Sequence, residues 1–177
     1  MGTPVTEEEF AAMFAAFRTS AFRLETREHY ALTYEQDAFD RFLRGKPLPP
    51  DALPWWQSWL DDMARLTGQG KRIERVRVLA EPPSSYQRWE MWGAHWHISV
   101  GERIRYMSRS AAVALGIPVD SDWWLFDDER VVFMGFTNTG EISGKTLVTD
   151  PAIVAEHRKW RDLAVSHATP AESGAAA

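Results

Sequence analysis

Three side chains that could bind a polar ligand lie close together at the start of a predicted helix. Tyr86, Arg88 and Glu90 supply a hydroxyl, a guanidinium and a carboxylate. They follow a predicted strand that carries Arg75, and open α/β sheets tend to bind ligands near such helix starts. The pattern predicts a binding site there, and the alternative is a solvated helix end with local ion pairs.

Arginines also alternate along two predicted strands, with Arg75 and Arg77 on the first and Arg103 and Arg105 on the second. If the strands are neighbours, the four guanidinium groups could form a basic stripe that binds phosphate or carboxylate. We favour the alternative, in which they form a polar face of the sheet and pair with acidic residues such as Glu74.

Two histidines flank a tryptophan in His95-Trp-His97. On a strand both imidazoles would share a face, as a metal site requires, but on the helix predicted here they diverge. Since spacing identifies no third ligand, we predict structural or surface histidines, no metal and no cofactor.

Tryptophan is unusually frequent, with 9 in 177 residues. Trp89, Trp92 and Trp96 recur at helical spacing, which is typical of a hydrophobic core. Trp123 and Trp124 are adjacent on a predicted strand and must face opposite sides of the sheet. Either helices cover both faces, or one indole lies in a pocket or an interface, where tryptophan is favoured.

These patterns give a candidate set of ligand- or partner-binding residues: Tyr86, Arg88, Trp89, Glu90, Arg105 and Trp124. No catalytic residue is assigned. A hairpin is predicted over residues 122–136, and it carries only carboxylates at its turn, where an enzyme would usually have a nucleophile, a ligand triplet or a phosphate loop.

A sheet with helices packed on it must position these side chains. Capping signals and apolar spacing predict helices over residues 7–18, 35–44, 54–68, 86–100, 110–115 and 151–163. Alternating patterns predict strands within residues 20–33 and over 72–79, 102–107 and 141–148, besides the hairpin.

The strand over 72–79, the helix after it and the strand over 102–107 form a βαβ unit, whose strands should be parallel with a right-handed crossover. We predict an α/β fold, with α+β as the alternative: a mixed sheet with this crossover, a C-terminal hairpin and helices packed on the sheet. Residues 1–168 should form a single domain with an N-terminal helical segment, and residues 169–177 a disordered tail. Residues 46–50, rich in proline, are the best linker candidate.

Composition restricts the function further. A formal net charge of -5 argues against a broad phosphate-binding surface, so we expect no direct binding to nucleic acid. The chain has no cysteine, an acidic start and no apolar run of bilayer-spanning length, so we expect a soluble cytoplasmic protein.

Several short motifs together resemble a known family: Phe22-Arg-Leu-Glu-Thr26, Arg75-Val-Arg-Val78, Arg105-Tyr106, Trp124-Leu-Phe-Asp-Asp128, Arg130-Val131, Asp150-Pro151 and His157-Arg-Lys-Trp-Arg161. Over roughly residues 17–170 the chain resembles a family of actinobacterial domains of unknown function, commonly encoded beside helix-turn-helix regulators. The resemblance implies a role in a regulatory module, with a helix-turn-helix protein as partner, and no particular activity.

The order of elements is similar to one half of the phospholipase D fold. The signature of that superfamily, His-x-Lys-x(4)-Asp, supplies a nucleophilic histidine, a phosphate-binding lysine and an orienting carboxylate. His157-Arg-Lys159 copies its first three positions, but Ala164 stands where the aspartate belongs. On the predicted helix, residues 157 and 159 also point about 200° apart. The similarity therefore implies a degenerate scaffold that binds something.

Two hypotheses follow, and we prefer a non-enzymatic binding or regulatory accessory protein that recognises a helix-turn-helix regulator or senses a small ligand. It predicts an exposed apolar or aromatic patch and no converging titratable groups. The alternative is a small hydrolase or phosphodiesterase that uses residues such as His157, Lys159, Glu90 or His95. It predicts a cleft with a histidine within hydrogen-bond reach of a carboxylate. A third, weaker hypothesis is that the acidic surface mimics nucleic acid.

Overall fold

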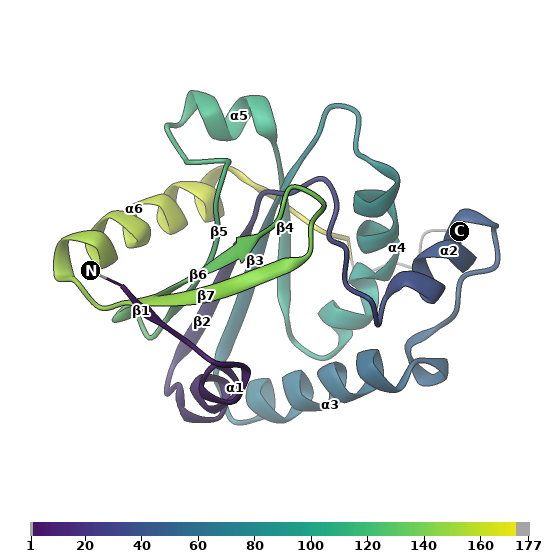
Figure 1. Ribbon diagram of the computed structural model, residues 1–177, viewed down its shortest axis with the longest axis horizontal. Coiled ribbons are helices and arrows are strands. Elements are labelled where there is room, and N and C mark those ends of the chain that lie inside the picture. Colours follow the sequence, from purple (N-terminus) through teal and green to yellow (C-terminus); the bar gives the residue numbers. More distant parts are fainter. Residues whose placement is uncertain (1, 173–177) are drawn as a thin grey trace.

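The computed structural model describes residues 2–172, which form a mixed sheet of eight strands in the order β1-β7-β6-β5-β2-β3-β4-β8 (Figure 1). In chain order the strands are β1 (Thr3–Pro4), β2 (Ser20–Glu25), β3 (Arg72–Leu79), β4 (Arg103–Ser108), β5 (Asp122–Phe126), β6 (Arg130–Phe136), β7 (Ile142–Val148) and β8 (Thr169–Pro170). β2, β3 and β4 pair in parallel, and every other neighbouring pair is antiparallel. The predicted α/β class with a mixed sheet is confirmed.

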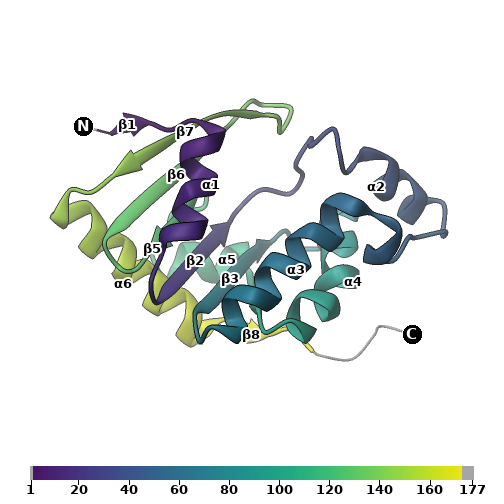
Figure 2. The same cartoon turned by 90° about the horizontal axis from the view of Figure 1, so that it is seen from below.

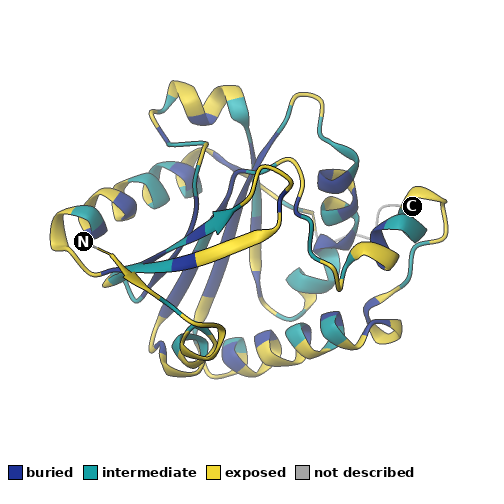
Figure 3. Cartoon of the chain, viewed as in Figure 1, coloured by how far each residue is buried: buried dark blue, intermediate teal, exposed yellow. Residues whose placement is uncertain are grey.

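Helices pack on both faces of this sheet. They are α1 (Glu7–Ala16), α2 (Gln36–Leu43), α3 (Pro54–Gly68), α4 (Ser85–Ser99), α5 (Arg109–Ala114) and α6 (Pro151–His167), with a 3₁₀ turn at Pro50–Ala52. α5 and α6 cover one face, where Val154 packs in a cluster with Val76 and Trp123. α1 and α3 cover the opposite face, where Met63 packs with Trp124 (Figure 2). Buried residues concentrate in the central strands between these layers (Figure 3).

Local sequence signals decide where the helices begin. The Thr6 hydroxyl accepts a hydrogen bond from the N–H of Glu9 at 3.1 Å, and the Glu9 carboxylate accepts one from the N–H of Thr6 at 2.8 Å. This is the predicted capping box, which supplies partners for N–H groups that a helix start leaves free. The Asp150 carboxylate caps α6, ahead of Pro151, by accepting hydrogen bonds from the N–H groups of Ala152 and Ile153.

The predicted βαβ unit is confirmed, since α4 connects β3 to β4 and the two strands are parallel neighbours. Side chains alternate between the faces of a sheet, so the register decides which face each one reaches. Ile73 lies in the cluster beneath α3, and Arg75 and Arg77 share its phase. Arg105 pairs in register with Val76, whose side chain belongs to the opposite face.

The predicted hairpin is also present as β5 and β6. Its turn holds Asp127 and Asp128 at φ of 53° and 58°, and two positive φ values are characteristic of a type I′ turn. The Asp127 carboxylate accepts hydrogen bonds from the N–H groups of Arg18 at 2.9 Å, Thr19 at 2.8 Å and Ser20 at 3.2 Å. These bonds attach the hairpin to the start of β2, which lies beside β5.

The C-terminal segment differs in part from the expectation of a tail disordered from residue 169. Thr169–Pro170 pairs with β4 as strand β8, whereas residues 173–177 lie outside the described residues. The proline-rich segment over 46–50 joins α2 to α3, and Phe39 and Trp56 on either side of it share one hydrophobic cluster. Within residues 2–172, no helix is long and apolar enough to cross a membrane.

Candidate functional site

A cavity of about 390 Å³ lies against the face of the sheet that α1, α3 and α4 cover. Its floor comes from β2, β3 and β5, and its walls come from the three helices, the segment before α2, and β6 and β7. Most of the wall residues are aromatic: Phe10, Phe14, Tyr30, Tyr34, Trp55, Trp56, Trp59, Tyr86, Trp89 and Phe136. Pockets of this volume and character commonly hold small organic molecules.

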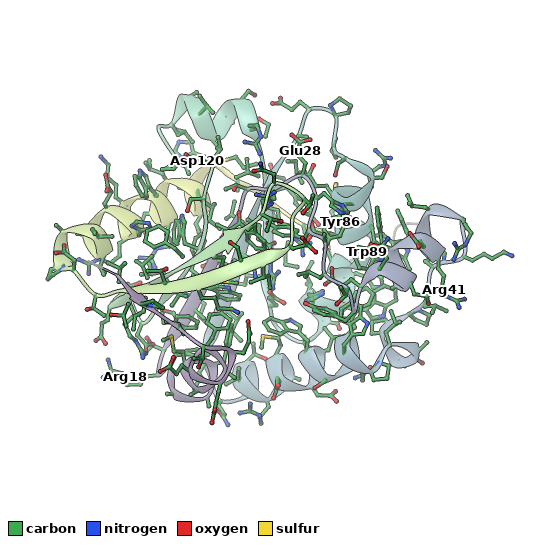
Figure 4. All side chains as sticks on the ribbon, in the orientation of Figure 1. Arg18, Glu28, Arg41, Tyr86, Trp89 and Asp120 are labelled. Atoms are coloured by element: carbon green, nitrogen blue, oxygen red, sulfur yellow. The ribbon has the colours of Figure 1, made fainter. Side chains whose placement is uncertain are left out.

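Four of the six predicted binding residues line this cavity: Tyr86, Trp89, Glu90 and Trp124. Figure 4 labels Tyr86 and Trp89, which lie on the first turns of α4. The indole of Trp124 comes up from β5 in the floor. Their placement brings them together, and their role in binding stays a prediction.

The other two predicted residues lie elsewhere. Arg88 donates hydrogen bonds to the carbonyl of Pro83 at 2.7 Å and the hydroxyl of Ser85 at 2.8 Å, so it braces the exposed start of α4. Arg105 pairs with Glu74 at 3.5 Å on the opposite face of the sheet. The basic stripe is therefore divided between two faces, and the ion-pair alternative describes Arg105 better.

Glu25 at the end of β2 organises the floor. Its two carboxylate oxygens accept hydrogen bonds from Arg75 at 2.9 Å and from Arg77 at 2.8 Å. Although burial favours the protonated carboxyl, the guanidinium groups of Arg75, Arg23 and Arg77 lower the pKa of Glu25 to about 2. Arg75 also donates to Glu102 at 2.9 Å, so carboxylates hold both β3 arginines.

Arg23 is held more loosely than the other two arginines. Its guanidinium lies between the rings of Tyr30 and Trp124, at 5.9 Å and 5.4 Å from their centroids. Its Nε lies 3.0 Å from Glu25 and its Nη2 3.7 Å from Asp122, but it donates no aligned hydrogen bond to any residue within 2–172. It therefore retains donor capacity beside the cavity.

Two carboxyl groups on the cavity wall titrate close to neutral pH. Burial raises the pKa of Glu90 to about 8, even though Arg77 lies 3.2 Å away, and the nearby Glu25 and Glu35 reinforce the shift. Burial likewise raises the pKa of Glu35 to about 7, against the hydrogen bond that it accepts from Tyr86 at 2.5 Å. Perturbed carboxyl groups of this kind often mark functional sites.

His97 also lines the cavity, and both of its ring nitrogens have partners. Nε2 accepts a hydrogen bond from the indole N–H of Trp56 at 3.0 Å, which leaves Nδ1–H to donate to Glu102 at 2.8 Å. Burial lowers the pKa of His97, in keeping with a neutral imidazole. His95 instead contacts the carbonyl of Trp92. In the described part of the chain, no group of three His, Cys, Asp or Glu residues could hold a metal ion.

The two adjacent tryptophans combine both predicted alternatives. Helices cover both faces of the sheet, and Trp124 additionally lines the cavity, whereas Trp123 packs beneath α6. The prediction of an absence of converging titratable groups was wrong, since Glu35, Glu90 and His97 meet at one cavity. The hydrolase hypothesis predicted a histidine within hydrogen-bond reach of a carboxylate, and His97 makes such a contact with Glu102.

The partial His157-Arg-Lys159 signature is not part of this site. His157 is 3% exposed, lies edge-on to Trp123 with 4.8 Å between ring centroids, and places Nδ1 2.8 Å from the carbonyl of Ile153. Lys159 is exposed on α6, on the far face of the sheet. The two side chains diverge, as the helical spacing predicted.

The signature spacing recurs at the hairpin with other residue types. Asp120, Asp122 and Asp127 occupy positions i, i+2 and i+7. Asp122 accepts hydrogen bonds from the hydroxyls of Thr26 at 2.8 Å and Tyr30 at 2.5 Å, so it is a structural acceptor. Neither a histidine nor a lysine stands at these positions.

The sequence patterns missed Arg23, Glu25 and Glu35. Arg23 and Glu25 alternate with apolar residues on β2, which suggested a half-buried strand, but both faces of this strand are covered. Two charged motifs could have indicated the floor: Arg-x-Glu on β2 and Arg-x-Arg on β3. In the parallel register their charged residues lie side by side.

The family described as a domain of unknown function (DUF6879) matches residues 8–173. No curated protein matches the chain.

Solved structures are similar in fold. The phospholipase D family member Nuc from Salmonella typhimurium is 12% identical, with a TM-score of 0.51, over 96% of this chain and 98% of that one. NucT from Helicobacter pylori is 8% identical, with a TM-score of 0.50, over 92% and 89%. TrmBL2, described as an archaeal chromatin protein with a novel mode of DNA binding, is 9% identical, with a TM-score of 0.52, over 96% and 52%. At these identities the similarity shows a phospholipase-D-like fold alone.

Proposed function

The chain belongs to the family described as a domain of unknown function (DUF6879), and because that description assigns no activity, we propose a function from the cavity itself: non-enzymatic binding of a small organic molecule. The observation that carries this proposal is the cavity, which combines aromatic walls with a few polar groups around its floor. Apolar surface gives a ligand affinity, and sparse polar groups fix its orientation.

The floor offers an anchor for a hydrogen-bond acceptor on the ligand. Arg23 has no aligned hydrogen bond within residues 2–172, whereas Arg75 and Arg77 are engaged by Glu25. Because Glu25 holds Arg75 and Arg77 in place, these two guanidinium groups are preorganised, and preorganised groups lower the entropy cost of binding a ligand. We expect the apolar body of the ligand to pack between the indoles, with Arg23 available to any hydrogen-bond acceptor that the ligand carries.

Side-chain chemistry favours binding over covalent catalysis. No serine, threonine or cysteine is among the described residues that line the cavity, and the one lining lysine, Lys145, pairs with Glu7. Activating His97 as a general base would require it to give up its bond from Trp56. These contacts support recognition as the main role.

A small hydrolase or phosphodiesterase remains the second candidate, because Glu35 and Glu90 have pKa values near those of catalytic general acids. Turnover of p-nitrophenyl esters, phosphodiesters or glycosides that Glu90→Gln abolishes would favour this function. If turnover appears and a His157→Ala, His95→Ala double variant retains it, these two histidines take no part.

The regulatory role and the helix-turn-helix partner rest on the family resemblance. Exposed apolar side chains at the cavity, Tyr34 and Ile142, supply surface that a partner could contact. We propose that a helix-turn-helix regulator, of the kind that the family resemblance implies, associates with the protein at micromolar concentration. Failure of the two purified proteins to co-elute at that concentration would remove this part of the proposal.

The cavity itself can be tested with a pair of tryptophan substitutions on β7. Ile142 lines the cavity and is 41% exposed, so Ile142→Trp should narrow the opening without disturbing the core. Ser143 is the next residue, is also exposed and does not line the cavity, which makes Ser143→Trp the matched control. Binding is measured by ligand-observed NMR with a fragment set of amines, carboxylic acids and heteroaromatic rings.

We expect fragments to bind the unmodified chain and Ser143→Trp, and to bind Ile142→Trp at least about tenfold more weakly. Fragments that bind all three proteins equally, or none of them at millimolar concentration, would contradict the proposed function.

A further inference from the structure

Carboxyl groups outnumber guanidinium groups around the cavity. The guanidinium groups are Arg23, Arg75 and Arg77, and the carboxyl groups are Glu25, Glu35, Glu90, Glu102 and Asp122. The other two charged residues that line the cavity, Lys145 and Glu7, form an ion pair, so their charges cancel. Five carboxyl groups around three guanidinium groups leave the site two positive charges short when every group is ionised.

Glu35 and Glu90 are the carboxyl groups that lack enough positive charge nearby. Glu25 and Glu102 lie directly against arginines, with Glu102 2.8 Å from Arg75. Asp122 is farther from its arginine, but it accepts hydrogen bonds from the hydroxyls of Thr26 and Tyr30. Glu90 has Arg77 at 3.2 Å but accepts no aligned hydrogen bond at its carboxyl group within residues 2–172, and its side chain is 12% exposed. The carboxyl group of Glu35 accepts a single hydrogen bond in the described part of the chain, from Tyr86.

A buried carboxylate without enough positive charge nearby is unstable and takes up a proton instead. Burial raises the pKa of both groups to near neutral, to about 7 for Glu35 and about 8 for Glu90. A cation entering the cavity would remove the shortage and let both groups ionise. The carboxyl groups of Glu35 and Glu90 could therefore release their protons and bind a cation in their place.

The walls favour the same kind of ligand. The faces of aromatic rings attract cations, and tryptophan does so most strongly. Trp55 and Trp56 stack at 5.7 Å, and the cavity already holds protein cations over ring faces, with Lys145 5.2 Å from Phe10. His97 is neutral, so it adds no repulsion.

We propose that the cavity binds an organic cation, an amine or quaternary ammonium on a small apolar body, with its charge beside Glu90 and Glu35 and its body against Trp56 and Trp89. The proposal rests on the proposed function and adds the charge of the ligand.

Binding of the cation should be coupled to proton release, because the ligand stabilises the ionised carboxylates. The charged and titratable groups that face Glu90 are Arg23, Glu25, Tyr30, Glu35, Arg75, Arg77, Tyr86 and Tyr106. Among these groups, Glu35 also has a pKa near neutral. Affinity for the cation should therefore rise between about pH 6 and pH 8, by up to about tenfold per pH unit for one coupled proton.

Three probes with one phenyl body separate ligand charge from ligand shape: phenethylammonium, 2-phenylethanol and 3-phenylpropionate. Benzyltrimethylammonium distinguishes a hydrogen-bonded ammonium from a purely cation–π contact. Calorimetry at pH 7 in phosphate and in Tris measures proton release, because the two buffers differ in ionisation enthalpy. The proteins are the 177-residue chain, Glu90→Gln, and Glu8→Gln as a control at an exposed carboxylate on α1.

We expect at least one of the two cations to bind at least about tenfold more tightly than the alcohol or the carboxylate. Glu90→Gln should lose that preference and the proton release, and Glu8→Gln should keep both. Should Glu90→Gln fail to fold, Glu35→Gln serves as the second variant with the same expectation.

Tighter binding of 2-phenylethanol or 3-phenylpropionate than of both cations would overturn the proposal that the ligand is a cation. The proposed function, binding of a small organic molecule, would still stand. The same holds if no cation binds while other fragments occupy the cavity. If nothing binds the cavity at all, both proposals fail together.

Discussion

Glu25 links two strands through charge, because one carboxylate holds Arg75 and Arg77 in the floor of the cavity. The side chain of Arg75 is 8% exposed and that of Arg77 is 7% exposed, so water is a poor substitute for Glu25 as a partner. Removing one partner of a buried ion pair is strongly destabilising, because the other partner is left as an uncompensated buried charge.

Glu25→Gln should therefore destabilise the fold by about 3–5 kcal/mol, since it leaves buried guanidinium groups short of negative charge. Urea denaturation followed by far-UV circular dichroism measures the change. Glu156→Gln, at an exposed position on α6, is the control and should change stability little. A Glu25→Gln protein as stable as this control would show that the floor does not depend on the ion pairs.

Stability should also depend on pH in two opposite ways. Glu35 and Glu90 have folded-state pKa values near 7 and 8, above the value of 4.5 expected for an unfolded chain. Their contribution is therefore complete below about pH 4.5 and is lost as pH rises through 7 and 8. Glu25 has a folded-state pKa near 2, so its contribution is lost as pH falls from about 4.5 towards 2.

Melting temperatures measured from pH 3 to pH 9 should show a maximum near pH 5, and Glu90→Gln should flatten the alkaline side only. An alkaline side that is equally steep in Glu90→Gln would exclude Glu90 as its cause.

At the scale of elements, one glycine allows α4 to pack against α3. A Cβ atom at Gly93 would lie 2.8 Å from the ring of Trp56, closer than carbon atoms can approach. The same indole lines the cavity and donates to His97. Close packing of the two helices thus positions a wall of the cavity.

Gly93→Ala should lower stability by about 1–3 kcal/mol through overpacking, even though alanine is the better helix former. Since Trp56 must shift, binding in the cavity should weaken as well. Gly68→Ala, at the end of α3 where nothing lies within 4 Å, is the matched control and should be neutral or slightly stabilising. Equal stability of the two variants would show that the Gly93 contact is not restrictive.

Elements and their ends could be predicted from the sequence where the determinants are local. Thr6 with Glu9 and Asp150 with Pro151 mark helix starts by hydrogen bonds within one turn. The phase of β3 relative to β4 is not local, so Arg105 could not be assigned to a face. Glu35 was equally hidden, because its burial comes from α4, which is distant in sequence.

Over the whole molecule, the two faces of the sheet differ in how they are covered. Beneath α5 and α6 the apolar cluster includes Trp123, and Trp160 packs against it. On the other face, the cavity lies between α1, α3 and α4 over a charged floor. The phospholipase-D-like fold is shared with proteins of 12% identity or less, and that similarity shows the fold alone.

The location of the ligand tests the account most directly, and the chain's nine tryptophans report on it. Phenethylammonium is titrated into protein labelled with ¹⁵N at the indole nitrogens, and the indole N–H signals are followed by NMR. The account predicts shifts at the tryptophans that line the cavity: Trp55, Trp56, Trp59, Trp89 and Trp124. The signals of Trp123 and Trp160, on the far face, should stay in place. Shifts confined to Trp123 and Trp160, or none at saturating ligand, would contradict it.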